Sequence, residues 1–417
     1  MRLAKILHYS KNALPLRFLE EALIAFSFNI GGILAGFMVA SQLNVFQLSP
    51  WAIAVYPAIL TARGVISGLF SGRLGTALHI GTIRPKLLGN TKSFYMLFKS
   101  IIFITLETSV AMSLVSMIFG SLFWGITFAH FSDILIVISA TMILGLTNSL
   151  LTIEIAFISF KKRLDPDVIV YPIMSTVADI IITFCYVFTL NLFFLSGFVG
   201  RYIVIFLGVM LIILALYILS RCAQDQEFVK TTRESLLTLA FVALIVNVTG
   251  TILKNISEIS EDISGIVGSR NEIYTVYPAM IDTVGDVGSV VGSTATTKLV
   301  LGVLNPSFHS IRNHSTRIFA TWIASIIMFI FYSFISLLTQ GTLTLHAFLN
   351  FSALLLIANL IAVSAIVIIS FAIAILTFRR GLDPDNFVIP IESSLADSIT
   401  TIALLVALFL VSYVGYG

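Results

Sequence analysis

The sequence predicts an all-α membrane protein that crosses the bilayer many times, and three observations support this prediction. Of the 417 residues, 58% are hydrophobic and only 11% are charged, which is too few charged groups to cover a water-exposed surface. The mean hydropathy is +1.03, and the chain divides into apolar segments of about 20 residues or more, the length that a helix needs to cross a bilayer. The third observation is an internal repeat, in which the second half of the chain follows the pattern of the first.

Apolar segments account for nearly the whole chain, so no separate soluble domain is expected. The first segment follows a short basic stretch, as in a signal peptide, but it is long enough to span a membrane and lacks a convincing cleavage site. We predict about eleven transmembrane helices, at residues 18–42, 51–80, 98–124, 133–160, 168–196, 202–220, 235–254, 274–304, 317–339, 345–378 and 388–414.

The basic residues predict the orientation of these helices. Most of the 24 Lys and Arg residues lie in alternate connections between the predicted spans, whereas the opposite connections hold only Arg201, Lys254 and Arg270. Under the positive-inside rule, the N-terminus is cytoplasmic and the C-terminus is extracytoplasmic, in a cell membrane. The basic residues do not gather on one tail or one amphipathic element, so the formal charge of +3 does not indicate a nucleic-acid partner. The lipid bilayer is the expected surrounding.

The internal repeat divides the chain into two related halves. The segments that match, each with its copy, are Tyr56–Pro85 with Tyr277–Pro306 and Asp165–Thr183 with Asp383–Thr401. A weaker echo aligns Asn29 and Gly32 with Asn247 and Gly250. Because all these matches have nearly the same offset, chance does not explain them.

Each half holds five predicted spans, and the span at 202–220 gives both halves the same orientation in the membrane. The expected fold is therefore two parallel-oriented five-helix repeats joined by a linking helix, a 5+1+5 arrangement. The first repeat comprises residues 1–200, the linking helix 201–222 and the second repeat 223–417. Such a fused pair relates its halves by a pseudo-two-fold axis along the membrane normal. We expect the chain to function as a monomeric pseudo-dimer with a pathway shared by both halves.

Ionisable groups inside apolar segments are the best candidates for function, because burying each one costs about 2.5–3.5 kcal/mol unless it faces a cavity or a partner. Asp179 and Asp397 occupy equivalent positions in the fifth span of each half. Hydroxyl residues lie one turn before and one turn after these acids on the same helix face, namely Ser175 and Thr183, and Ser393 and Thr401. Oxygen ligands at a symmetric position suit a hard cation, although such groups also serve as structural contacts between helices.

A second group of buried acids occurs in the second half only. Asp282 and Asp286 lie one turn apart on one helix face, beside glycines that allow close backbone approach. Their equivalents in the first half are Thr61 and Val65, with Arg63 between them. Arg63 is expected to supply a tethered positive charge that balances an acid or holds part of the pathway. Alternatively, its side chain snorkels toward the membrane surface or forms a structural pair.

One further acid, Glu392, takes the place of Met174 of the first half and lies near Asp397 in the sequence. The candidate metal ligands are therefore Asp179, Asp397, Asp282, Asp286 and Glu392, and the candidate pathway-lining residues are Ser175, Thr183, Ser393, Thr401 and Arg63. Cys185 and Cys222 have no His or Cys neighbour at metal-ligand spacing, which disfavours a site for a soft metal.

Two repeated motifs resemble a known family. The second span of each half begins with Pro-Ala and is rich in glycine, and the fifth follows Asp-Pro-Asp and carries spaced Pro, Ser and Asp residues. This pattern, in both halves, resembles the membrane domain of MgtE-type magnesium transporters, in particular their solute carrier 41-like branch. In that family, parallel five-helix units surround an ion pathway lined by second and fifth helices, and a fifth-helix aspartate binds hydrated magnesium. The resemblance implies that Asp179 and Asp397 belong to the central site.

The sequence therefore favours a transporter or channel for a divalent cation, Mg²⁺ first, which keeps most of its water in a carboxylate-lined pathway between two pseudo-symmetric halves. Mg²⁺ is then the transported ion, and no resident cofactor is expected. The alternative is a proton- or sodium-coupled transporter of a small organic solute, with Arg63 binding an anion. A third interpretation is an intramembrane enzyme acting on lipids. The chain lacks a clustered Asp-x-x-Asp arrangement and any metal-hydrolase, ATP-binding or nucleophile motif, so no enzymatic activity is expected.

Overall fold

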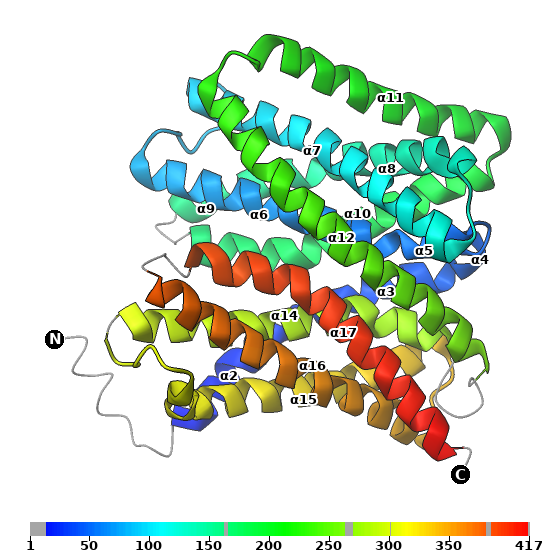
Figure 1. Ribbon diagram of the computed structural model, residues 1–417, viewed down its shortest axis with the longest axis vertical. Coiled ribbons are helices and arrows are strands. Elements are labelled where there is room, and N and C mark those ends of the chain that lie inside the picture. The colour runs from blue at the N-terminus through cyan, green and yellow to red at the C-terminus, as the bar shows by residue number, and fades with distance from the viewer. Residues whose placement is uncertain (1–13, 162–165, 263–269, 301, 381–384, 416–417) are drawn as a thin grey trace. The chain divides into compact units, whose positions relative to one another are not determined.

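The computed structural model of the chain describes residues 14–161, 166–262, 270–300, 302–380 and 385–415. These residues are predominantly helical and contain no strand, which confirms the predicted all-α class (Figure 1). In chain order the helices are α2 (Leu14–Ser27), α3 (Ile30–Ser41), α4 (Leu43–Phe46), α5 (Pro50–Ala54), α6 (Tyr56–Ile80), α7 (Lys92–Phe119), the π-helix η1 (Gly120–Trp124), the 3₁₀ helix η2 (Phe128–His130), α8 (Phe131–Gly145), α9 (Thr147–Lys161), α10 (Pro166–Phe194), α11 (Gly197–Cys222), α12 (Gln226–Asp262), α14 (Arg270–Val300), the 3₁₀ helix η3 (Phe308–His314), α15 (Ser315–Gln340), α16 (Leu345–Arg379) and α17 (Asp385–Gly415).

Local sequence explains several helix ends. The Thr344 hydroxyl accepts a hydrogen bond from the backbone N–H of Ala347 at 3.1 Å and so caps the start of α16. Gly81 ends α6 and Gly341 ends α15, with φ angles of +82° and +72°, a left-handed conformation that glycine adopts without steric cost. Capping residues and terminal glycines therefore determine where these helices begin and end, which apolar composition alone does not.

Seven helical segments of the described chain are long and apolar enough to cross a membrane, which supports a multi-pass membrane protein. They are Leu16–Ser41, Lys92–Trp124, Phe128–Ile158, Thr176–Phe194, Gly197–Cys222, Phe308–Gln340 and Leu345–Arg379. Each coincides with a predicted span. Shorter apolar helices at Val242–Ile256 and Leu395–Val411 overlap two more, and α6 and α14 occupy the remaining two as helices of 25 and 31 residues. The count of eleven spans and the 5+1+5 arrangement stay predictions.

The helices pack into two compact units that do not coincide with the two halves of the sequence. The C-half unit comprises the described residues of Met1–Phe37 and Ile259–Gly417, and the N-half unit comprises Met38–Glu258. The C-half unit therefore includes α2, which packs along α15 (Figure 1), and most of α3. The N-half unit includes most of α12. Each unit thus takes its first helix from the other half of the sequence, and the predicted division at 201–222 remains a statement about the sequence repeat.

Glycines on these exchanged helices allow close contact with the segment that begins the second helix of each unit. A Cβ atom on Gly32 of α3 would lie 2.8 Å from the backbone nitrogen of Ala279 in α14. In the N-half unit, a Cβ atom on Gly250 of α12 would lie 1.8 Å from the carbonyl oxygen of Ala54. Because Gly32 and Gly250 are equivalent in the repeat, close backbone packing by a small residue occurs in both units.

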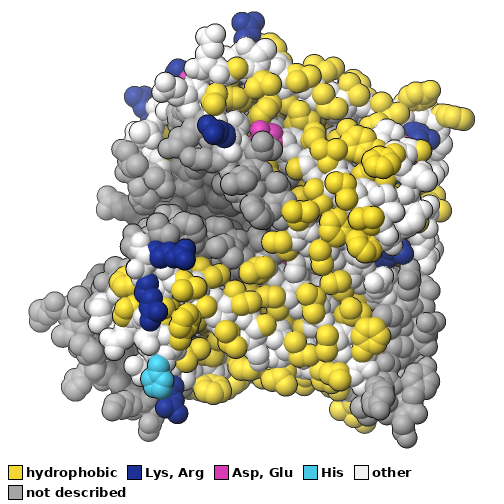
Figure 2. All heavy atoms as spheres, in the orientation of Figure 1, with side chains coloured by type: hydrophobic (Ala, Val, Ile, Leu, Met, Phe, Trp, Pro, Cys, Tyr) yellow, Lys and Arg dark blue, Asp and Glu magenta, His cyan; other side chains and the backbone are white. Residues whose placement is uncertain are grey.

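The exposed surface is apolar over large areas. Along α11, the side chains of Phe198, Tyr202, Phe206 and Ile213 are all exposed. Figure 2 shows a face largely covered by hydrophobic side chains, with the Lys and Arg side chains toward its edges. Apolar surface of this extent is typical of a protein embedded in a bilayer rather than surrounded by water.

Candidate functional site

A buried ion pair joins the second and fifth helices of the N-half unit. Arg63 of α6 donates from Nη2 to the Oδ1 atom of Asp179 in α10. Both residues are buried, with 8% of Arg63 and 2% of Asp179 exposed. Two residues that the sequence identified separately, one as a candidate pathway residue and one as a candidate metal ligand, are therefore direct partners.

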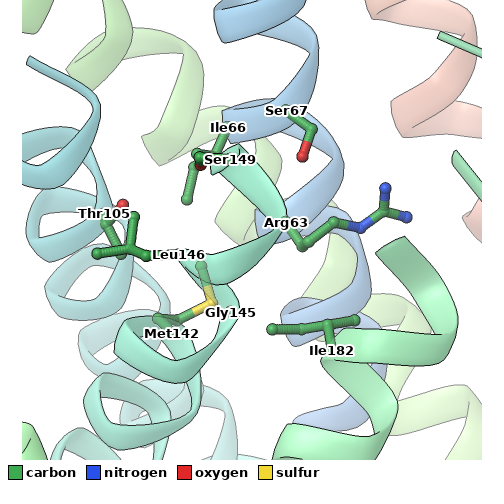
Figure 3. Close-up of a pocket in the computed structure, with 9 residues that line it drawn as sticks. All are labelled: Arg63, Ile66, Ser67, Thr105, Met142, Gly145, Leu146, Ser149 and Ile182. Atoms are coloured by element: carbon green, nitrogen blue, oxygen red, sulfur yellow. The ribbon is translucent and has the colours of Figure 1, made fainter. Parts of the chain in front are cut away.

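The Arg63 side chain also borders a small pocket. Its Nε atom is buried and has no hydrogen-bond partner among the described residues. Its side chain lines this pocket together with Ser67, Thr105 and Ser149, and Figure 3 shows the guanidinium group pointing away from the other labelled side chains. Apolar residues complete the lining and no carboxylate contributes to it, so this pocket offers hydroxyl groups but no anionic ligand for a cation.

The second and fifth helices are joined by the same hydrogen bond in both units. Tyr56 and Thr183 share a hydrogen bond of 3.0 Å between their hydroxyl oxygens, and Tyr277 and Thr401 share one of 2.8 Å. We refer to these two contacts as the register bonds. All four side chains are buried, and each threonine follows a candidate aspartate by one turn. The sequence analysis did not include the two tyrosines among the candidate site residues. The signal that could have identified them is that both repeats have a tyrosine at this position.

In the C-half unit, Asp286 belongs to a hydrogen-bonded network. The Asn29 side-chain nitrogen donates to Asp286 Oδ2 at 2.8 Å and to the Thr283 hydroxyl at 3.2 Å. The Thr283 hydroxyl also shares a 2.7 Å hydrogen bond with the hydroxyl of Tyr332. Asn29 lies in the turn between α2 and α3, so a residue of the first half of the sequence orients an acid of the second half.

The equivalent asparagine of the N-half unit makes different contacts. Asn247 accepts a 2.7 Å hydrogen bond from Ser116 and donates one of 2.7 Å to the carbonyl oxygen of Ala243. Ala62 and Val65 stand at the repeat positions of Thr283 and Asp286, and neither side chain has a polar group to bond. At the equivalent positions of the N-half unit, the described residues therefore form no acidic network of this kind.

The remaining predicted site residues are placed as follows. Asp282 lies half-buried on α14 one turn before Asp286, and Asp397 lies half-buried on α17. The side chains of three predicted residues, Ser175, Ser393 and Glu392, lie outside the described part of the structure. Among the described residues, no three His, Cys, Asp or Glu side chains come together closely enough to hold a metal ion directly.

Comparison with known families covers both halves of the chain. MgtE, a family of divalent cation transporters, matches residues 56–189 and 277–407, which together make up more than half of the sequence. The chain belongs to the MgtE family. No match was found among curated proteins or among solved structures. Each MgtE match begins at a tyrosine of a register bond and ends beyond the threonine that it contacts.

Membership of the MgtE family bears on several predictions. MgtE proteins are transporters, in agreement with the expectation that the chain is not an enzyme. The two matches start 221 residues apart, which is the offset of the sequence repeat. They include most of the second and fifth helices of both units, with the residues Arg63, Asp179, Asp282, Asp286 and Asp397. Asn29 lies outside the matched regions, so the family match alone does not identify its contact with Asp286.

Proposed function

We propose that this MgtE-family protein carries Mg²⁺ across the membrane as a largely hydrated ion. The observation that carries the proposal is the double match to a divalent cation transporter family, once in each half of the chain. Mg²⁺ dehydrates reluctantly and usually keeps several waters, so separated carboxylates are suited to hold it through its water shell. In the proposal these carboxylates belong to Asp397, Asp282 and Asp286, with Glu392 five residues before Asp397 in the sequence. The fifth candidate, Asp179, is the partner of Arg63.

The chemistry of these groups favours a hard cation. Carboxylate oxygens are the ligands that Mg²⁺ prefers, whereas softer metals select thiolate and imidazole ligands. Among the described residues, no three His, Cys, Asp or Glu side chains form a group that could hold a metal ion directly. A small divalent ion surrounded by water therefore fits the donor set better than a tightly coordinated transition metal does.

The proposal includes the topology that the sequence predicts. The two halves line one pathway, the N-terminus is cytoplasmic, and the C-terminus is extracytoplasmic, as the distribution of Lys and Arg indicates. The chain works as a monomeric pseudo-dimer in the lipid bilayer, in the manner of the solute carrier 41-like branch. The two copies of the register bond support this proposal, because they give both halves the same pairing of second and fifth helices.

Flux in proteoliposomes tests the proposed function. Purified protein is reconstituted under a Mg²⁺ gradient, Mg²⁺ entry is followed with a trapped fluorescent indicator, and Ca²⁺ and Mn²⁺ are added as competitors. We expect the wild type to carry Mg²⁺, and we expect Asp397→Asn to lower the flux by about tenfold or more, because the variant removes a charge that attracts the ion.

Asp133→Asn is the matched control for this experiment. It is also an acid-to-amide change, but Asp133 lies at the start of α8 and pairs with Arg201 at 3.1 Å, outside the second and fifth helices. We expect its flux to stay within about twofold of the wild type, since partly exposed ion pairs contribute little. Absence of Mg²⁺ flux in the wild type, or full flux in Asp397→Asn, would contradict the proposal.

A further inference from the structure

The second and fifth helices carry different charges in the two halves. The repeat aligns four positions around the candidate acids. They are Thr61, Arg63, Val65 and Asp179 in the first half and Asp282, Val284, Asp286 and Asp397 in the second. The first set contains one basic and one acidic residue, so its formal charges cancel. The second set contains three acidic residues and no basic residue. The two halves therefore present different electrostatic environments to a cation.

The register bonds show which residues correspond in space. In the N-half unit, Arg63 follows its register tyrosine along α6, whereas Asp179 precedes its register threonine along α10, so the two helices run antiparallel. The second register bond joins the equivalent residues of α14 and α17, and the sequence repeat aligns Val284 with Arg63 and Asp397 with Asp179. Val284 therefore takes the position of Arg63 at the level of Asp397, and the position that supplies a guanidinium in one unit supplies only an isopropyl group in the other.

A buried carboxylate with a guanidinium partner is a poor ligand for a mobile cation. Guanidinium stays protonated under all ordinary conditions, so its positive charge is permanent. Displacing it from Asp179 would leave a buried charge without its partner, which is strongly unfavourable. A divalent ion that approached Asp179 would also be repelled by Arg63 across a medium of low dielectric constant. Since both residues are almost fully buried, water does little to screen either effect.

We propose that Arg63 is a built-in counter-cation for Asp179, which prevents Asp179 from holding the transported divalent ion. The guanidinium group occupies the space beside this carboxylate that a metal ion or its water shell would otherwise take. This inference rests on the proposed function and adds that the two halves have different roles. The acids of the C-half unit hold the ion, whereas the Arg63–Asp179 pair of the N-half unit has no net charge and holds none.

The Mg²⁺ flux of a variant that lacks both members of the ion pair tests the inference. In Arg63→Val/Asp179→Asn both buried charges disappear together, and valine is the residue that the second half has at this position. We expect this double variant to retain much more Mg²⁺ flux than Asp397→Asn, which loses about tenfold or more. Size-exclusion profiles and thermal unfolding in detergent establish that both proteins are folded. Equal loss of flux in the two variants would overturn the proposal, because Asp179 would then act as a ligand in spite of its partner.

Metal binding provides a second readout, with Mn²⁺ as the probe because electron paramagnetic resonance distinguishes its bound and free forms. Arg63→Val leaves the Asp179 carboxylate available, so we expect about one more bound Mn²⁺ per chain than in the wild type. Arg63→Lys keeps a positive charge and is expected to bind the same number as the wild type. Addition of Asp179→Asn to Arg63→Val removes the extra ion. No extra ion in folded Arg63→Val overturns the proposal, and if Arg63→Val does not fold, the flux of the neutral double variant decides.

These experiments separate failure of this inference from failure of the proposed function. A wild type that neither carries Mg²⁺ nor binds Mn²⁺ overturns both. A wild type that transports Mg²⁺ and depends equally on Asp179 and Asp397 overturns the inference and leaves the proposed function intact.

Discussion

The N-half and C-half units share their packing and differ in their charges. Both have a register bond between the second and fifth helices, and both have a glycine on an exchanged first helix. At one equivalent position, however, the N-half unit has Arg63 paired with Asp179, whereas the C-half unit has Val284 between two acids. A duplicated helical fold needs its packing contacts in both copies. Its charged groups are able to diverge, provided that each buried charge has a partner or a cation.

The exchange of first helices makes the two units depend on each other. Asn29 belongs to the first half of the sequence and donates a hydrogen bond to Asp286 of the second half. Its equivalent, Asn247, contacts the hydroxyl of Ser116 instead. The exchange therefore has a packing role in both units, and in the C-half unit it also orients an acid of the proposed ion pathway.

The largest expected effect comes from the glycines of the exchanged helices. Gly250→Ala places a methyl group 1.8 Å from the carbonyl oxygen of Ala54, and we expect it to destabilise the protein by about 3 kcal/mol. Gly32→Ala meets the nitrogen of Ala279 at 2.8 Å and is expected to cost less. Gly64→Ala on α6 is the control, because apart from its chain neighbours and the backbone of its own helix no described atom lies within 4 Å of the added methyl group. Thermal unfolding in detergent measures the losses, and equal stability of Gly250→Ala and Gly64→Ala would contradict the close packing of α12.

Much of the fold is predictable from the sequence because the relevant signals are local. Apolar segments of spanning length predict the helices, and repeated motifs predict that the chain has two related halves. The exchange of first helices is not predictable in this way. A repeat states that Gly32 corresponds to Gly250, but it does not state which half of the chain each helix packs against. That choice depends on tertiary contacts such as the approach of Gly250 to Ala54.

In the candidate site, too, the sequence predicts which residues matter but not which of them are in contact. The cost of burying charge singles out Arg63 and Asp179 as separate candidates, and the ion pair emerges only when α6 and α10 are placed side by side. The symmetry of Asp179 and Asp397 in the sequence favours equivalent roles, whereas the contacts of Asp179 make its surroundings different. That Asp397 holds Mg²⁺ and Asp179 does not stays a prediction.

Placing an arginine at the equivalent position of the C-half unit tests whether the charge difference between the units affects transport. Val284→Arg puts a guanidinium group at the position equivalent to Arg63, where we expect it to compete with the ion for Asp397. Mg²⁺ flux is expected to fall by about tenfold, which corresponds to a weakening of roughly 1.4 kcal/mol. Because Val284 is fully buried, Val284→Met is needed as a long, uncharged control. If the methionine variant loses as much flux in proteoliposomes as the arginine variant, side-chain size rather than charge explains the loss.

The smallest expected effect on stability comes from removing either register bond. Tyr56→Phe and Tyr277→Phe each remove one hydroxyl group and its hydrogen bond, of 3.0 and 2.8 Å respectively. Hydrogen bonds between helices in membranes contribute about 0.6 kcal/mol on average, so both variants should lose a similar small amount of stability in thermal unfolding. A loss in only one variant would contradict the equivalence of the two bonds.

The flux of the same two variants should differ even though their stability does not. Tyr277 holds the fifth helix of the C-half unit at a threonine one turn from Asp397, so Tyr277→Phe loosens an acid that the proposal places beside the ion. We expect its Mg²⁺ flux to fall by less than about threefold, in proportion to one weak hydrogen bond. Tyr56→Phe should leave the flux at the wild-type level, because Arg63 still holds Asp179 in place. Equal flux losses would mean that both fifth helices serve the ion alike, and that the charge difference between the units does not divide their roles.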